Sequence, residues 1–73
     1  MWKYDENRMI ALRESRGFTQ TQFAHKLGNK HKQVVSAWEK RNVLPSISTL
    51  VAISNIFGIV PAYFFTWTDD FEI

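Results

Sequence analysis

The 73-residue chain lacks cysteine altogether. Neither a disulfide framework nor a thiolate metal site is therefore available, and a reducing compartment is the expected setting. No stretch approaches the roughly 20 apolar residues that span a bilayer. The start of the chain also lacks the basic cluster and apolar run of a secretory signal. These absences predict a cytoplasmic protein that does not enter a membrane.

Groups suited to catalysis are also scarce. His25 and His31 fall on separate predicted helices without a carboxylate at a useful spacing, and the chain has no glycine-rich phosphate loop and no His/Glu metal pattern. Asp69 and Asp70 are adjacent, but they lack the further oxygen ligands that a cation site needs. We therefore expect no enzymatic activity, no metal, no cofactor and no small-molecule substrate.

The net charge of +2 is unevenly distributed. Residues 16–41 carry six basic side chains against Glu39 alone, a local charge of +5, whereas residues 42–73 carry three acidic and no basic side chains. A positive patch of this kind raises the local concentration of a polyanion and attracts phosphates without regard to sequence. The plainer interpretation is a solvated helical face.

The apolar pattern predicts one compact, all-α domain of five short helices, because a chain of this length cannot support two cores. We place the helices at about residues 5–16, 19–27, 30–41, 46–57 and 61–65, with Gly17, Gly28 and Gly58 closing the first, second and fourth.

The second helix has the clearest start. Thr19 with Gln22 three residues later forms a capping box, and Phe18 can pack on Phe23 as a hydrophobic staple. Ala24 supplies the small side chain that two steeply crossing helices need where they approach. The inner face of the third helix is expected to hold Val35 and Trp38, and that of the fourth Ile47, Leu50, Val51, Ile53 and Phe57.

The two ends of the chain carry further apolar residues. Trp2 and Tyr4 precede the first helix and are expected to cap the core. Near the other end, Phe65, Trp67, Phe71 and Ile73 are separated by polar residues, with a period of two that Asp69 interrupts. That pattern fits a strand that pairs with a symmetry mate, and equally a frayed or locally packed tail. We thus divide the chain into a domain at 1–65 and a tail at 66–73, a candidate dimerisation segment.

Four features in a fixed order give the chain a family resemblance: the Thr-Gln-x-x-Phe-Ala start of the second helix, the Leu-Gly turn, the Val-Ser-x-Trp-Glu of the third helix, and a proline six residues after that Glu. With these features, residues 8–65 resemble the Cro/C1-type (XRE-like) helix-turn-helix family of phage and bacterial repressors. The resemblance implies a lambda-repressor-like fold with its helix-turn-helix at about residues 19–41.

The resemblance also implies roles for individual residues. Gln20, at the start of the second helix, matches a phosphate contact. Positions that read base edges match Lys32, Gln33 and Ala37, which suit guanine, adenine and the thymine methyl group respectively. A phosphate-contacting stretch matches Lys40, Arg41 and Asn42, and Arg13 with Glu39 matches a structural ion pair. The assignment to base, phosphate or solvent stays open for Lys30, His31 and Ser36, and that of Lys32 is open by about one position.

Two departures from the family pattern concern the ends of the third helix. The spacing from Gly28 to Glu39 is one residue longer than is usual, so that either the turn has grown or the helix begins earlier, with Asn29 as its cap. Arg41 replaces a glycine that usually follows the Glu, and Asn42 can supply the left-handed residue instead.

These observations predict a sequence-specific double-stranded DNA-binding protein. We expect a small transcriptional regulator, a repressor, that acts as a homodimer on a palindromic operator in a bacterial or host-cell cytoplasm, associated with the nucleoid. The alternative is a protein-interaction module on the same scaffold, such as an antitoxin or anti-repressor. The candidate dimer contacts are Val43, Leu44, Trp67, Phe71 and Ile73.

Overall fold

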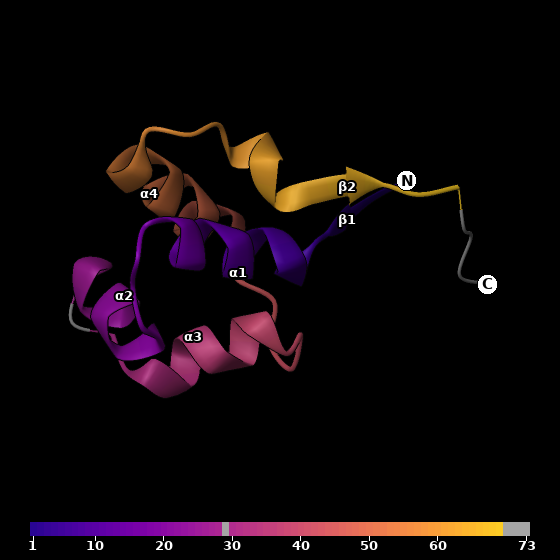
Figure 1. The fold of residues 1–73 in the computed structure, drawn as a ribbon. Coiled ribbons are helices and arrows are strands. Elements are labelled where there is room, and N and C mark those ends of the chain that lie inside the picture. The colour runs from indigo at the N-terminus through magenta and orange to yellow at the C-terminus, as the bar shows by residue number, and fades with distance from the viewer. Residues whose placement is uncertain (29, 70–73) are drawn as a thin grey trace.

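The computed structural model describes residues 1–28 and 30–69. These residues form two short strands, four α-helices and one 3-10 helix (Figure 1). They are β1 (Trp2–Tyr4), α1 (Glu6–Ser15), α2 (Gln20–Lys26), α3 (Lys32–Glu39), α4 (Ile47–Phe57), η1 (Pro61–Phe64) and β2 (Phe65–Trp67). The predicted small helical fold is therefore confirmed, although its fifth helix is a single 3-10 turn, which begins at Pro61. None of the helices in the described ranges has the length and apolar character needed to cross a membrane.

Side-chain caps explain where the helices begin. Asp5 accepts a hydrogen bond from the backbone N–H of Asn7, and Ser46 accepts one from Thr49. At α2 the capping box is complete: the Gln22 N–H donates to the Thr19 hydroxyl at 3.1 Å, and the Thr19 N–H donates to the Gln22 side-chain oxygen at 2.9 Å. These bonds satisfy donors that the helix itself leaves free, so the predicted start of α2 is confirmed.

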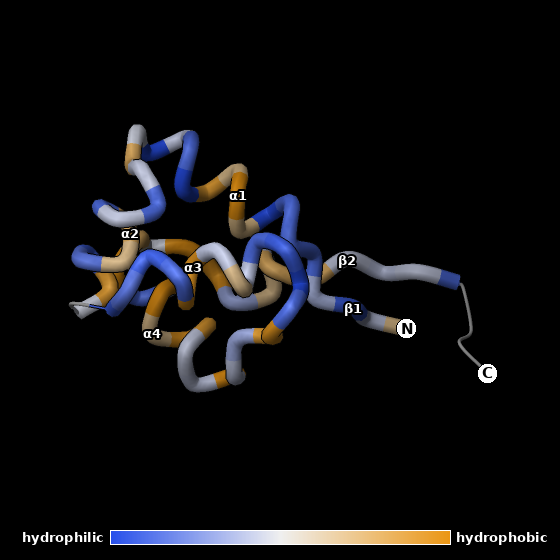
Figure 2. Tube along the Cα trace, turned by 90° about the horizontal axis from the view of Figure 1, so that it is seen from below, coloured by the Kyte–Doolittle hydropathy of each residue, from blue (hydrophilic) through white to orange (hydrophobic). Residues whose placement is uncertain are grey.

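The core lies between α1, α2, α3, α4 and η1. Its fully buried side chains include Phe23 of α2, Val35 of α3 and Phe64 of η1. The rings of Phe18 and Phe23 lie 6.3 Å apart, as the predicted staple requires. Figure 2 shows hydrophobic residues inside the helical body and hydrophilic residues at both ends of α3. The remaining buried hydrophobic residues are Tyr4, Met9, Leu12, Ala24, Trp38, Leu50, Ile53 and Phe57.

The predicted inner face of α4 was too wide. Ile47 is 66% exposed and Val51 is 39% exposed, so both were wrongly assigned to the core. The buried positions of α4 are Leu50, Ile53, Ser54 and Phe57, which share one helical face at spacings of three and four residues. Ser54 was not expected among them. Its hydroxyl is satisfied because it donates to the Leu50 carbonyl at 2.7 Å.

The two strands form an antiparallel sheet that extends from one end of the helical body (Figure 1). Trp2 pairs with Trp67, Lys3 with Thr66, and Tyr4 with Phe65. The period-two pattern therefore marks a strand, but this strand pairs with the start of its own chain. Tyr4 belongs to the core as expected, whereas Trp2 does not, being 64% exposed. Phe71 and Ile73 lie outside the described residues.

Candidate nucleic-acid interface

The turn between α2 and α3 sets where the third helix begins. The backbone N–H of Lys30 donates to the Ala24 carbonyl at 3.1 Å, which holds Lys30 against the end of α2. His31 then occupies the N-cap position, and α3 starts at Lys32. The additional residue in this chain has therefore lengthened the turn. The alternative of an earlier start capped by Asn29 is wrong, and the helix is shorter than the predicted 30–41.

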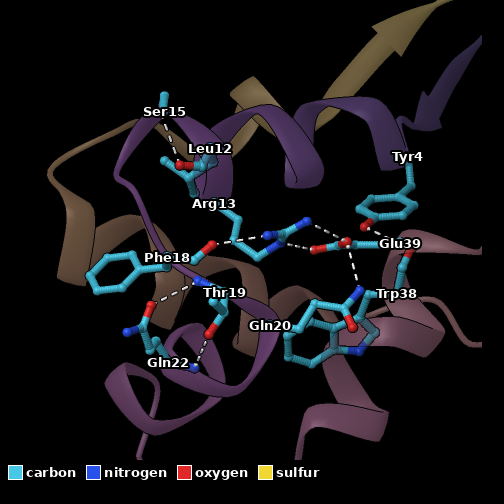
Figure 3. Close-up of polar contacts among 10 residues, drawn as sticks. All are labelled: Tyr4, Leu12, Arg13, Ser15, Phe18, Thr19, Gln20, Gln22, Trp38 and Glu39. Carbon is cyan, nitrogen blue, oxygen red and sulfur yellow. Dashed lines mark hydrogen bonds and ion pairs between the residues drawn. The ribbon is translucent and has the colours of Figure 1, made fainter.

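Arg13 and Glu39 form a two-pronged ion pair between α1 and α3 (Figure 3). The Arg13 Nε donates to Glu39 Oε2 at 2.7 Å, and its Nη2 donates to Oε1 at 3.2 Å. The third guanidinium nitrogen donates to the Phe18 carbonyl at 2.9 Å. The Arg13 side chain is only 15% exposed and that of Glu39 only 6% exposed. The hydrogen bonds that Arg13 donates to Glu39 raise the pKa of Arg13, so this arginine stays charged in the protein.

Gln20 joins the same carboxylate from a third helix. Its Nε2 donates to Glu39 Oε1 at 3.0 Å, as the dashed line in Figure 3 shows. This bond fixes which end of the amide faces Glu39 and leaves one Nε2 hydrogen for another acceptor. This bond was not predicted, because 19 residues separate the partners and no local pattern in the sequence signals it.

The outer face of α3 gathers the side chains that were assigned to base edges. Lys32 and Gln33 are exposed in the first turn, and Ala37 lies half-buried one turn further on, next to the half-buried Ser36. Lys32 and Ser36, like Gln33 and Ala37, are four residues apart and therefore lie one turn apart on the same side of the helix. Val35 and Trp38 are buried in the core, and Glu39 is buried beside Arg13 and Gln20.

The end of α3 is a Schellman motif with an unusual residue in it. Arg41 has a φ of 59°, and the Asn42 N–H donates to the Ala37 carbonyl at 3.0 Å. The left-handed position thus belongs to Arg41 and not, as predicted, to Asn42, because the motif places it directly after the C-cap Lys40. The Arg41 Nε lies 3.6 Å from Glu6 Oε2, and its side chain is 45% exposed. Lys40, Arg41 and Asn42 are all exposed in this loop.

Tyr4 ties the sheet to the back of α3. Its hydroxyl donates to the Trp38 carbonyl at 3.2 Å inside the protein (Figure 3). Burial raises the pKa of Tyr4 above its ordinary value, and the carboxylates of Glu6 and Glu39 add to the effect. The sequence placed Tyr4 over the core but gave no sign of this bond. Together with the Glu39 contacts, it fixes the buried side of α3 to β1, α1 and α2.

Comparison with known protein families gives one match. A family model described as helix-turn-helix matches residues 9–65, a span that runs from α1 through η1 and includes the three helices joined at Glu39. Neither a curated protein nor a solved structure matches the chain.

Proposed function

Because the chain belongs to the helix-turn-helix family of DNA-binding transcription regulators, of the Cro/C1 (XRE-like) type, we propose that it is a repressor that binds a palindromic operator as a homodimer. In each copy α3 enters the major groove, and the start of α2 lies over a phosphate. The protein acts on double-stranded DNA at the nucleoid and requires no cofactor, metal or small-molecule substrate.

The observation that carries this proposal is the position of the Glu39 carboxylate. It accepts hydrogen bonds from Arg13 of α1 and from Gln20 of α2, while it belongs to α3 itself. The recognition helix is thereby held in a fixed orientation relative to the helix before it. A fixed orientation matters because base contacts require side chains to meet the groove in one register.

Base readout in this proposal comes from the first two turns of α3. Lys32 and Gln33 are its first two residues and both are exposed. A Lys ammonium donates to guanine O6 and N7, a Gln amide pairs with adenine, and the Ala37 methyl contacts a thymine methyl. Ser36 lies between these side chains on the same face and completes the surface that meets the base edges.

Phosphate contacts come from both ends of the helix pair. Gln20 retains one amide hydrogen for a phosphate oxygen at the N-terminus of α2, where the helix dipole also favours an anion. Beyond α3, Lys40, Arg41 and Asn42 are exposed in a single turn. Lys30 and His31 precede α3 and are also exposed. Their contacts position the protein without reading sequence.

Dimerisation supplies the affinity that one small unit lacks. A single module of this size covers about half the surface of a typical specific protein–DNA interface, and two half-sites one helical turn apart supply the rest. Val43 and Leu44 are 57% and 54% exposed in the loop after α3, and Trp67 is 59% exposed in β2. We assign these side chains, together with Phe71 and Ile73, to the contact between copies.

Selection from a randomised duplex library tests the proposal. The purified protein is bound to the library at two salt concentrations, and the retained duplexes are separated by gel shift and sequenced. The proposal predicts a palindromic motif whose half-sites lie about one helical turn apart. Weak, salt-sensitive retention without any motif would reduce DNA binding to a non-specific background and contradict the proposal.

One observation favours the alternative of a protein-interaction module. The exposed indole rings of Trp2 and Trp67 lie 5.5 Å apart, edge to face, on the sheet and not on α3. Large aromatic side chains gathered on a surface are typical of protein contacts. If the protein binds no duplex, but Trp2→Ala abolishes its binding to a protein partner, the result would support this second function, in which the chain acts as an antitoxin or anti-repressor.

A further inference from the structure

A groove runs along the outer edge of β1. It has a volume of about 400 Å³ and lies between β1 and the segment that joins α3 to α4. Trp2, Lys3 and Tyr4 of β1 line it, together with Phe65 of β2, the partner of Tyr4 in the sheet. The groove therefore follows β1 over its whole length. Leu44 and Ile47, 54% and 66% exposed, form the opposite wall.

Among residues 1–28 and 30–69, strand pairing leaves the edge of β1 that lies away from β2 open. Met1 exchanges hydrogen bonds with Thr68, and the Asp5 N–H donates to Phe64, so the backbone groups of alternate residues point toward β2. In an antiparallel pair the residues between them direct their N–H and C=O groups the other way. These are Trp2 and Tyr4, so their backbone groups point away from β2, and both residues line the groove. An open edge beside an apolar wall is the geometry that accepts an added strand.

The charges around the groove indicate the chemistry of that strand. Lys3, Arg41 and the N-terminal ammonium lie along it. A second β1 would place Lys3 against its own copy in the register that uses both open residues, and like charges directly opposite are destabilising. An extended segment with carboxylates and apolar side chains in alternation is the better match. Residues 69–73, Asp-Asp-Phe-Glu-Ile, have this composition.

The topology decides which copy supplies the segment. Thr68 already pairs with Met1, so the chain leaves the sheet at the start of β1. To reach the other edge within the same copy, it must cross two strand spacings, about 10 Å, which uses most of its five residues at about 3.3 Å each. A two-fold axis at the start of β1 instead places residues 69–73 of a second copy directly alongside the groove. By the same symmetry, this segment of the first copy meets the groove of the second.

We propose that residues 69–73 of one copy pair with the outer edge of β1 in a second copy, in the groove formed by Trp2, Leu44 and Ile47, and that this reciprocal exchange builds the homodimer. The inference rests on the proposed homodimer and assigns its contacts. Two separate candidate dimer contacts then belong to one interface: the loop at Val43 and Leu44 borders the groove, and the tail of the other copy fills it.

Cysteine cross-linking tests the exchange, because the natural chain has no cysteine. Leu44→Cys protein is mixed with differently tagged Phe71→Cys protein and oxidised mildly, and the disulfide-linked heterodimer is quantified. Val60→Cys is the matched control, since Val60 is an equally exposed apolar residue at 67% that does not line the groove. We expect the Leu44→Cys pairing to exceed the Val60→Cys pairing at least tenfold, a difference of about 1.4 kcal/mol.

Sedimentation of the full chain and of the chain without residues 70–73 separates this inference from the proposed homodimer. Deletion is expected to weaken dimerisation at least about tenfold, and Leu44→Asp is expected to act in the same direction while Val60→Asp does not. A dimer that survives the deletion, or equal cross-linking with Val60→Cys, overturns the exchange and leaves the homodimer standing. A full-length chain that stays monomeric, both free and on DNA, overturns both.

Discussion

The Nε of Arg13 lies 2.7 Å from Glu39 Oε2, and the other oxygen of that carboxylate accepts a hydrogen bond from Gln20 at 3.0 Å. One carboxylate therefore holds α1, α2 and α3 together. Glu39 is buried, whereas Lys32 and Gln33 of the same helix are exposed. The surface proposed to read DNA thus depends on a residue that does not itself belong to it.

Replacement of Glu39 should destabilise the fold. Glu39→Ala leaves the Arg13 guanidinium mostly buried without its partner, and loss of one member of a buried ion pair costs about 3 kcal/mol of unfolding free energy. The urea midpoint of unfolding measures the effect. Glu14→Ala, at an exposed position of α1, is the control and should change stability by no more than about 0.5 kcal/mol. Equal midpoints for the two variants would show that the pair contributes little.

Gln20→Ala should weaken binding to all duplexes by a similar factor. The substitution removes the amide that we assign to a phosphate, and phosphate contacts carry no sequence information. Lys40→Ala should behave alike and in addition reduce the salt slope of binding by about 1. Fluorescence anisotropy with two unrelated duplexes measures both effects. Thr21→Ala, an exposed neighbour on α2, serves as the control. Arg13 still holds Glu39 in this variant, and affinities equal to those of Thr21→Ala would contradict the assignment of Gln20 to phosphate.

Lys32→Ala should change which bases are preferred. Loss of a side chain that donates to guanine costs about 1–3 kcal/mol at one position of the half-site and relaxes the preference there. Repeated library selection with the variant identifies that position. Lys26→Ala removes the same charge at the end of α2 and should keep the original motif. If both variants return the unchanged motif, Lys32 does not read a base.

Arg41→Gly should stabilise the protein while it weakens DNA binding. Arg41 holds a φ of 59°, a conformation that costs a residue with a Cβ about 1 kcal/mol and that glycine adopts freely. The contact with Glu6 at 3.6 Å is partly exposed and offsets little of this gain. Thermal unfolding provides the measurement. Lys40→Gly is the matched control, because Lys40 has a φ of −97° and its replacement should lower stability. A melting temperature of Arg41→Gly below that of the natural protein would contradict the backbone strain that we assign to Arg41.

Tyr4→Phe should alter the response of the protein to alkaline pH. Burial raises the pKa of Tyr4 in the folded state above its ordinary value of 10.0. A group whose folded pKa exceeds its unfolded pKa contributes stability that is fully present below pH 10 and is lost as the pH rises toward the folded value. The unfolding free energy should therefore fall more steeply above pH 10 in the natural protein than in Tyr4→Phe. Below pH 10 the variant should lose about 1 kcal/mol with the bond to Trp38.

Local patterns account for the parts of the structure that the sequence predicted well. The capping box at Thr19 and the stop at Gly58 depend on neighbours within a few residues, and both are present. Short-range chemistry of this kind is read directly from spacing. The resemblance assigned Lys32, Gln33 and Ala37 to base edges, and that assignment stays a prediction.

Long-range contacts account for what the sequence left open. The pairing of Trp67 with Trp2 joins the two ends of the chain, and no local pattern distinguishes such a partner from a symmetry mate. The width of the buried face of α4 could not be predicted from the sequence either. Apolar residues also occupy exposed positions, as Ile47 does here. At Arg41 the geometry of the helix end imposes a left-handed conformation, although glycine and asparagine adopt this conformation more readily than arginine.

The most direct test of the central claim compares the affinity of the protein for its selected operator with its affinity for a scrambled duplex. Both duplexes have the same length and composition, and both titrations use the same physiological salt concentration. The proposal predicts that the operator binds at least about a thousandfold more tightly, as specific sites do, with two copies per duplex. Equal affinities, or one copy per duplex without preference, would contradict the proposal that this protein is a sequence-specific dimeric repressor.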